Sequence, residues 1–467
     1  MVPFFPKQIA NKGIYFYFGA FVVTSLLFLD YTLSAEFIVM GIVSVVTFFM
    51  ASAWCSQKWQ NIPEKKMILY LSLIAFGLRL AWVLFSYFYF SSKTGIPFEF
   101  SSADAQWYYE ESIGNINTHW KDIWNYLFVD SATVSDSGYV FYLTFLSKLF
   151  GTNIIFPRII NSVLSVATCL LIYLLAKRNI GEEGGRMAAI FACFMPNLIF
   201  YCGLHLKETT MLFLMMAYLE RTDSLLRSKR YNVITIALPI LLAISLFTFR
   251  TVLGATAVFS FVTALLFTNT SIIGRTKRLL LIGWGILTVL TLNGGTIMNE
   301  IDGLLEDRES NQVNKRLTQT ARGNKWAQYA TGTVMTPMMF VLPFPTMVDV
   351  DQQYNQQILH GGNYVRDFLG GFVLIAIFSA LFITKNWRNL SLIGSFVFAY
   401  LGVISMSGFS NSERFLLPGL PLLLIMAAYG ITQLNAKNYR FIKIWYWIVP
   451  LMTLGWAFFK LGSRGIV

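Results

Sequence analysis

The sequence is dominated by apolar segments of roughly 15–24 residues, which is long enough to cross or nearly cross a lipid bilayer. Of its 467 residues, 55% are hydrophobic and only 13% are charged. A soluble domain carries roughly 25% charged residues, so this chain has about half the usual charge. The pattern predicts an all-α polytopic membrane protein, and it excludes a soluble enzyme, a disordered regulator and a disulfide scaffold.

Hydropathy predicts about thirteen transmembrane helices. The expected spans are 14–30, 33–54, 67–90, 154–176, 185–203, 208–220, 232–249, 251–268, 279–292, 366–384, 389–406, 415–434 and 444–459. Two long connections, 91–153 and 293–365, interrupt the series. We expect both loops to contain short interfacial helices, because their apolar pieces are too short to span.

The distribution of charge sets the expected orientation. The net charge is +12, and most of the basic residues fall in the short loops between spans. Positively charged loops favour the cytoplasmic side, which places the N-terminus inside and both long loops outside. This arrangement explains the basic character better than nucleic-acid binding does. The cytoplasmic loops contain no phosphate-binding glycine motif, so chemistry without ATP is expected on the outer face.

Ionisable residues near or inside the apolar slab are the most informative, because each is costly unless it is paired or hydrated. Segment 209–220 has 12 residues and rises only about 18 Å as a helix, less than a bilayer core. The preceding apex, with His205, Lys207 and Glu208, is therefore expected below the outer surface in a water-accessible cavity. A helix there would place His205 and Glu208 on one face. The alternative is a structural network that joins two short helices.

Four cations mark the outer ends of four different spans: Lys207, Arg250, Arg158 and Arg414. Convergence on one cavity would create a site for an anionic head group. Taken singly, each side chain could instead extend to the lipid phosphates. Arg79 lies in the middle of a span and must face the bundle interior. Two roles are possible for it there: contact with a ligand, or pairing with another residue.

The first long loop begins with the polar stretch SSADAQWYYEES, which contains Asp104, Tyr108, Tyr109 and Glu110. A carboxylate at the membrane surface beside aromatic rings suits a general base that acts on a hydroxyl group, with the rings stacking on a sugar. The alternative for Asp104 is an ordinary acidic residue of a polar loop.

Several of these motifs resemble those of one enzyme class. The stretch from FPRIINS at Arg158 to YLER at Arg221, the Asp104 loop and the ERFLLPGLP stretch at 413–421 are similar to membrane glycosyltransferases of the GT-C class. This class includes bacterial enzymes like the dolichyl-phosphate-mannose protein mannosyltransferases and the aminoarabinose transferases. The resemblance covers roughly 67–434, so 1–66 is interpreted as an N-terminal two-helix addition and 435–467 as a C-terminal helix.

The resemblance implies transfer of a sugar from a polyprenyl-phosphate or polyprenyl-diphosphate donor to a glycan or lipid acceptor. The reaction would take place on the extracytoplasmic face of a bacterial inner membrane. Asp104 would be the base, with inversion at the anomeric carbon, and Glu208 would hold the acceptor or a metal. The need for a divalent cation, Mg²⁺ or Mn²⁺, stays open. The residues expected to bind the donor phosphate are Lys207, Arg250, Arg414 and Arg158. The residues expected to contact other parts of the substrates are His205, Tyr108, Tyr109 and Glu110.

Two other functions remain as alternatives. A polymerase of O-antigen or exopolysaccharide repeat units also needs many spans and large outer loops, and the basic stretch 315–325 would then hold a growing glycan. A transporter or flippase of lipid-linked saccharides places its site near the midplane of the membrane, which Arg79 would fit.

Overall fold

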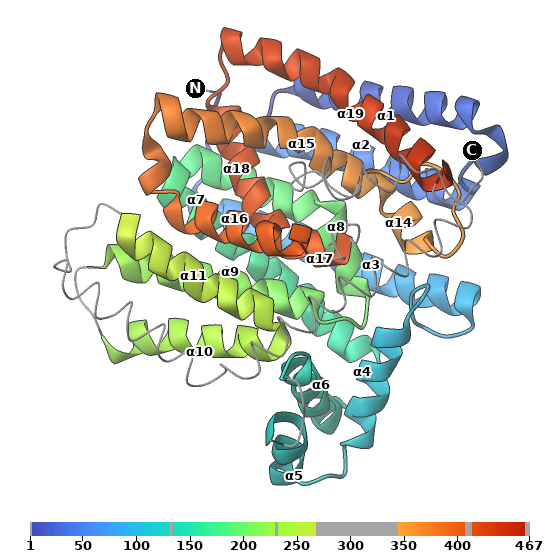
Figure 1. Cartoon of the computed structure of the whole chain (residues 1–467), viewed down its shortest axis with the longest axis vertical. Helices are drawn as coiled ribbons and strands as arrows, with labels where there is room; N and C mark the ends of the chain where they lie inside the picture. The colour runs from blue at the N-terminus through green and yellow to red at the C-terminus, as the bar shows by residue number, and fades with distance from the viewer. Residues whose placement is uncertain (1, 130–133, 229–231, 268–343, 407–412, 463–467) are drawn as a thin grey trace.

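The computed structural model describes residues 2–129, 134–228, 232–267, 344–406 and 413–462, and it shows a bundle of helices (Figure 1). Within these ranges there is no β-strand. The helices that form the bundle are α1 (Lys7–Leu27), α2 (Ala35–Lys58), α3 (Glu64–Thr94), α7 (Ile155–Phe194), α9 (Glu208–Arg227), α10 (Val233–Phe249), α11 (Thr251–Phe267), α15 (His360–Phe378), α16 (Ser391–Met406), α18 (Leu420–Thr432) and α19 (Ala436–Gly462).

Six helical segments in the described residues are long and apolar enough to cross a membrane, which supports an integral membrane protein. They are Ala35–Lys58, Glu64–Thr94, Ile155–Phe194, His360–Ile383, Glu413–Thr432 and Ala436–Gly462; the shorter apolar helices are Val233–Phe249, Thr251–Phe267 and Ser391–Ile404. The expected number of thirteen spans is not confirmed. Helices α1 and α9 are not among these segments, and the expected span 279–292 lies outside the described residues.

Helix α7 is assigned as one run of 40 residues, but the chain reverses direction inside it. Gly181 has φ 89° and ψ 170°, a conformation that only glycine adopts readily. In a straight helix, residues 177 and 185 would lie about 12 Å apart. Instead, a Cβ atom on Gly185 would lie 2.9 Å from the backbone nitrogen of Lys177. The two arms of α7 therefore form a hairpin, in agreement with two separate expected spans.

Ion pairs hold this hairpin at its turn. Glu182 lies 2.9 Å from Lys177 and 2.7 Å from Arg186, and Lys177 also lies 2.7 Å from Glu64 at the start of α3. Arg178 joins the turn to α9 by contacts of 2.9 Å with Glu220 and 3.0 Å with Asp223. The two arms of α7 and the beginning of α3 are thus fixed at one end of the bundle.

Arg79 is fully buried in α3, and all its described partners are uncharged. Its guanidinium donates to Ser165 at 2.7 Å and to the carbonyl oxygens of Ala192 and Cys193, each at 3.1 Å. These carbonyls lie at the end of α7, where helical hydrogen bonding stops and Pro196 follows. Arg79 therefore caps a helix end inside the bundle, which answers the question that the sequence left open.

The N-terminal helices pack directly on the C-terminal half of the chain. Tyr17 of α1 is hydrogen-bonded to His360 of α15 at 2.8 Å, and Tyr364 donates to the carbonyl oxygen of Gly13 at 2.8 Å. A Cβ atom on Gly41 of α2 would lie 2.1 Å from the His360 ring, so the close approach of α2 to α15 requires glycine there. Figure 1 shows α1 and α2 beside α15 and α19.

A separate group of short helices follows α3. It consists of α4 (Ala103–Gly114), α5 (Trp120–Trp124) and α6 (Ser137–Phe150), within the expected loop 91–153. In Figure 1 these helices project from the bundle, and α6 returns toward it by packing against α10. Of the second expected loop, 293–365, the described part includes α14 (Tyr354–Ile358), while 293–343 lies outside the described residues.

The orientation can be tested by cysteine labelling, because the four native cysteines are all buried. Ala103 at the start of α4 and Glu183 beside the Gly181 turn are both exposed. We expect Ala103→Cys to react with an impermeant thiol reagent in intact cells, and Glu183→Cys to react only after permeabilisation. Labelling of both positions from the same side would contradict the topology.

Candidate functional site

Charged side chains from five parts of the chain meet at the end of the bundle where α4–α6 lie. They come from the start of α4, the residues just before α6, the bend before α9 with its first residue, the link between α10 and α11, and α17 (Glu413–Leu416). We call the set Asp104, Asp136, Lys207, Glu208, Arg250 and Arg414 the Arg414 network. Each of its ion pairs joins residues from different elements.

Arg414 is at the centre of the network. Its Nε donates to Glu208 Oε1 and its Nη1 donates to Asp104 Oδ2. The Glu208 side chain is completely buried, whereas the Asp104 side chain is 59% exposed. One guanidinium group therefore connects an interior carboxylate to a carboxylate that solvent can reach.

Arg250 is the second cation beside Glu208, with its Nη2 3.6 Å from Glu208 Oε1. Its Nη1 donates to the Tyr400 hydroxyl at 3.3 Å, and that hydroxyl donates to the carbonyl oxygen of Phe415 at 2.7 Å. The guanidinium also lies 4.6 Å from the centre of the Phe415 ring, a cation–π distance. Arg250 is thus held on several sides and keeps a fixed orientation.

Lys207 forms an ion pair with Asp136, which directly precedes α6. Its ammonium group also donates to the carbonyl oxygen of Phe249 at the end of α10, at 3.0 Å. Asp136 is a site residue that was not predicted from the sequence. Interior cations outnumber interior acids in the sequence, so acids from the nearby loop must pair with them. This imbalance could have predicted Asp136.

The aromatic residues after Asp104 divide between two places. Tyr108, one helical turn after Asp104, is buried, and its hydroxyl interacts electrostatically with Glu208 and Arg414. Tyr109 packs edge-on against His205, with ring centres 5.7 Å apart. Glu110 is exposed, and the structure does not bring it to the network. A position six residues after Asp104 faces about 240° around the helix, which explains the separation.

Two expected substrate contacts, Arg158 and His205, lie beside the network rather than in it. Arg158 is fully buried at the start of α7 and donates to the carbonyl oxygen of Pro97. His205 lies in the bend before α9, which begins at Glu208, so His205 and Glu208 do not share a helix face. Burial lowers the pKa of His205 to about 3, which keeps the imidazole neutral.

Glu99 is a buried acid at this site that the sequence analysis missed. Only 4% of it is exposed, and burial raises the pKa of Glu99 to about 7, although Arg158 and Arg414 oppose that rise. The sequence around Glu99, PFEF, could have predicted this, because an acid between two phenylalanines indicates burial.

The carboxylates of the network do not fit a divalent cation. Asp104 and Glu208 both face Arg414, and Glu208 also faces Arg250. A metal ion between these carboxylates would meet two guanidinium groups, whose charge repels it. Among the described residues, no group of three or more His, Cys, Asp or Glu side chains is arranged to hold a metal. Arg414 takes the place that a bridging cation would occupy.

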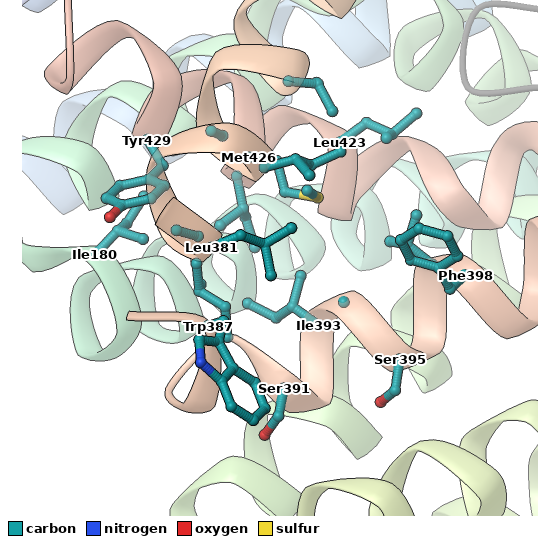
Figure 2. A pocket seen from close by; sticks show the side chains of 18 of the residues that line it. Ile180, Leu381, Trp387, Ser391, Ile393, Ser395, Phe398, Leu423, Met426 and Tyr429 are labelled. Atoms are coloured by element: carbon teal, nitrogen blue, oxygen red, sulfur yellow. The ribbon is translucent and has the colours of Figure 1, made fainter. Parts of the chain in front are cut away.

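An apolar pocket of about 590 Å³ lies along α16 (Figure 2). Its lining comes from α7, α11, α15, α16, α18 and the segment between α15 and α16, and it includes Leu381, Trp387, Phe398 and Leu401. The lining extends from Ile180, beside the Gly181 turn, to Leu401, which follows Tyr400 in the sequence; Tyr400 itself is not part of the lining. Such a lining suits a hydrocarbon chain and offers few partners to a polar ligand.

No protein-family model matches this chain, and no curated protein matches it at a significant level.

The burial of Glu99 predicts a pH dependence of stability. Its folded-state pKa of about 7 lies above the ordinary value of 4.5, so the folded state prefers the neutral acid. The contribution of Glu99 to the free energy of unfolding is therefore largest below pH 4.5 and falls by roughly 3 kcal/mol as the pH rises through 7. The charged groups that interact with it are Arg158, Arg414 and Glu208.

Thermal melts of the purified protein and of Glu99→Gln between pH 4.5 and 8 check this expectation. The wild type should lose stability relative to the variant across this interval, because glutamine does not titrate. A difference between the two that stays constant with pH would contradict it.

Proposed function

We propose that this protein is a membrane glycosyltransferase that moves a sugar from a polyprenyl-phosphate or polyprenyl-diphosphate donor to a glycan or lipid acceptor on the extracytoplasmic face. The observation that carries the proposal is Arg414 bridging Asp104 and Glu208 at one end of a bundle of apolar helices. A charge network at the end of a bundle of apolar helices, with Asp104 open to solvent, suits a substrate that is part lipid and part sugar.

In the proposed reaction the acceptor hydroxyl attacks the anomeric carbon of the donor sugar. The bond between that carbon and the phosphate oxygen breaks, polyprenyl phosphate or diphosphate leaves with the bonding electrons, and the configuration inverts. The hydroxyl proton passes to the carboxylate of Asp104. Its exposure supports this role, because the base must meet an acceptor that arrives from solvent.

The leaving phosphate requires charge stabilisation more than it requires a proton, and the cations supply it. Arg414, Arg250 and Lys207 are each oriented by acids or carbonyl groups before any substrate is present. Because their side chains are already ordered, little conformational entropy is lost when they bind the phosphate oxygens.

The apolar pocket along α16 supports a lipid-linked donor. A prenyl chain lying there would bury its hydrocarbon among Leu381, Phe398 and Leu401. Its phosphate end would then have to pass Tyr400, which lies on the same helix as Phe398 and Leu401, to reach Arg250. One substrate would thus occupy both the pocket and the network.

The alternatives receive less support. The stretch 315–325, on which the polymerase hypothesis depends, lies outside the described residues. The transporter hypothesis depended on Arg79, which is hydrogen-bonded to Ser165 and to backbone carbonyls in a structural role.

Replacement of Asp104 tests the base. Asp104→Asn should reduce the release of polyprenyl phosphate roughly 10²–10⁴-fold, because the amide cannot accept the proton, while donor binding is retained. The assay uses purified protein in nanodiscs with undecaprenyl-phosphate sugars and a membrane glycolipid extract.

The matched control for this assay is Asp122→Asn, an exposed acid on α5, which should keep full activity. EDTA should also leave the rate unchanged, because Arg414 stands between the carboxylates. Full activity of Asp104→Asn would refute its role as the base.

Replacement of Arg414 tests the donor phosphate site. Arg414→Ala should weaken the binding of undecaprenyl phosphate tenfold or more, because a hydrogen bond to a charged group contributes about 1.5–3 kcal/mol. Arg440→Ala, which removes an exposed arginine at the start of α19, is the control and should bind normally. Equal affinities for the two variants would contradict the assignment.

A further inference from the structure

Three buried polar residues lie outside the Arg414 network but adjacent to it: Glu99, Arg158 and His205. They come from the loop after α3, the first turn of α7 and the bend before α9. Their exposed fractions are 4%, 0% and 2%. Side chains of this kind are rarely buried without partners, so their hydrogen bonding must be accounted for.

Most of the polar atoms in this trio find no hydrogen-bond partner among the described residues. The unpartnered atoms are Glu99 Oε2, Arg158 Nε and Nη1, and both ring nitrogens of His205. Buried polar groups that lack partners destabilise a protein, so a concentration of them in one place indicates a site that gains its partners from a ligand.

The three residues form one contiguous patch. Arg158 donates to the carbonyl oxygen of Pro97, two residues before Glu99, and the His205 ring lies 6.2 Å from the ring of Phe98, the residue before Glu99. Glu99 also interacts electrostatically with Arg158. Glu99 also interacts with Arg414 and Glu208, which joins the patch to the network. The His205 ring is flanked nearly edge-on by Phe98 at 6.2 Å and by Tyr109 at 5.7 Å.

The mixture of donors and acceptors identifies the class of ligand. The two unpartnered guanidinium nitrogens carry three N–H donors, the carboxyl group supplies an acceptor, and a neutral imidazole supplies one donor and one acceptor. A phosphate only accepts hydrogen bonds, so it would leave Glu99 Oε2 and the acceptor nitrogen of the neutral His205 ring without a donor. Neighbouring hydroxyl groups of a sugar ring both donate and accept, and aromatic rings pack against the apolar parts of the sugar.

We propose that Glu99, Arg158 and His205 form a subsite that binds the hydroxyl groups of a sugar ring, next to the phosphate-binding Arg414 network. The proposal deepens the proposed function and rests on it. It moves Arg158 from the donor phosphate, where the sequence placed it, to the sugar. The ring can belong to the donor or to the acceptor, since the chemistry of recognition is the same.

The test compares two lipids that differ only in the sugar. Affinities for undecaprenyl phosphate and for a panel of undecaprenyl-phosphate hexoses are measured in nanodiscs for the wild type, Glu99→Gln and His205→Phe. A donor subsite predicts that both variants bind the hexose-bearing lipids about tenfold more weakly and bind undecaprenyl phosphate as the wild type does. Glu111→Gln, on α4, is the control for a general effect of removing an acid.

An acceptor subsite gives a different result. Affinities for both lipids stay unchanged, whereas a panel of methyl hexosides protects the wild type, but not the two variants, from hydrogen exchange at residues 95–109. The proposal is wrong if neither variant changes either measurement.

A different result would refute the proposed function. The proposed function is wrong if the wild type does not bind undecaprenyl phosphate or if Arg414→Ala binds it normally. The methyl hexoside measurement then still decides the subsite, because it requires no lipid.

Discussion

The completely buried carboxylate of Glu208 is the constraint on which the site depends. A charge in a low-dielectric interior is destabilising unless close partners compensate it. Arg414 and Arg250 are those partners, and both are in turn fixed by other groups. Arg414 binds Asp104, while Arg250 contacts Tyr400 and Phe415. One buried acid at the start of α9 thus determines how α4, α10, α16 and α17 meet.

The rest of the bundle brings Glu208 to that position. The chain reverses at Gly181, runs back along the second arm of α7 and ends where Arg79 binds the carbonyl oxygens of Ala192 and Cys193. The bend that follows is buried throughout residues 201–212. Arg79, for which the sequence left both a ligand contact and a pairing role open, therefore has an architectural role.

Much of the site could be predicted from the sequence, because a charge in an apolar context is conspicuous. Lys207, Glu208, Arg250 and Arg414 were singled out on that basis, and the structure brings all four together with Asp104. The acids that compensate the charge of these cations were not predicted. Asp136 and Glu99 looked like ordinary acids of a polar loop, and only the folded chain shows which loop acids turn inward.

Local spacing was a less reliable guide than charge. Glu110 is near Asp104 in sequence, but it lies on another face of α4, because contact depends on helical phase. His205 and Glu208 were expected on one helix face, and the helix begins only at Glu208. The number of spans was predicted only in part. The α7 hairpin agrees with two expected spans, but α1 and α9 are not among the segments long and apolar enough to cross a membrane, and 279–292 lies outside the described residues.

The depth at which Glu208 lies has a consequence for the proposed reaction. The Glu208 side chain is completely buried, whereas Asp104, which Arg414 joins to it, is 59% exposed. In the proposed reaction an acceptor would approach from the side of Asp104, because solvent reaches that carboxylate. The acceptor would then have to present one hydroxyl group to Asp104, so the site would select acceptors by the accessibility of that group.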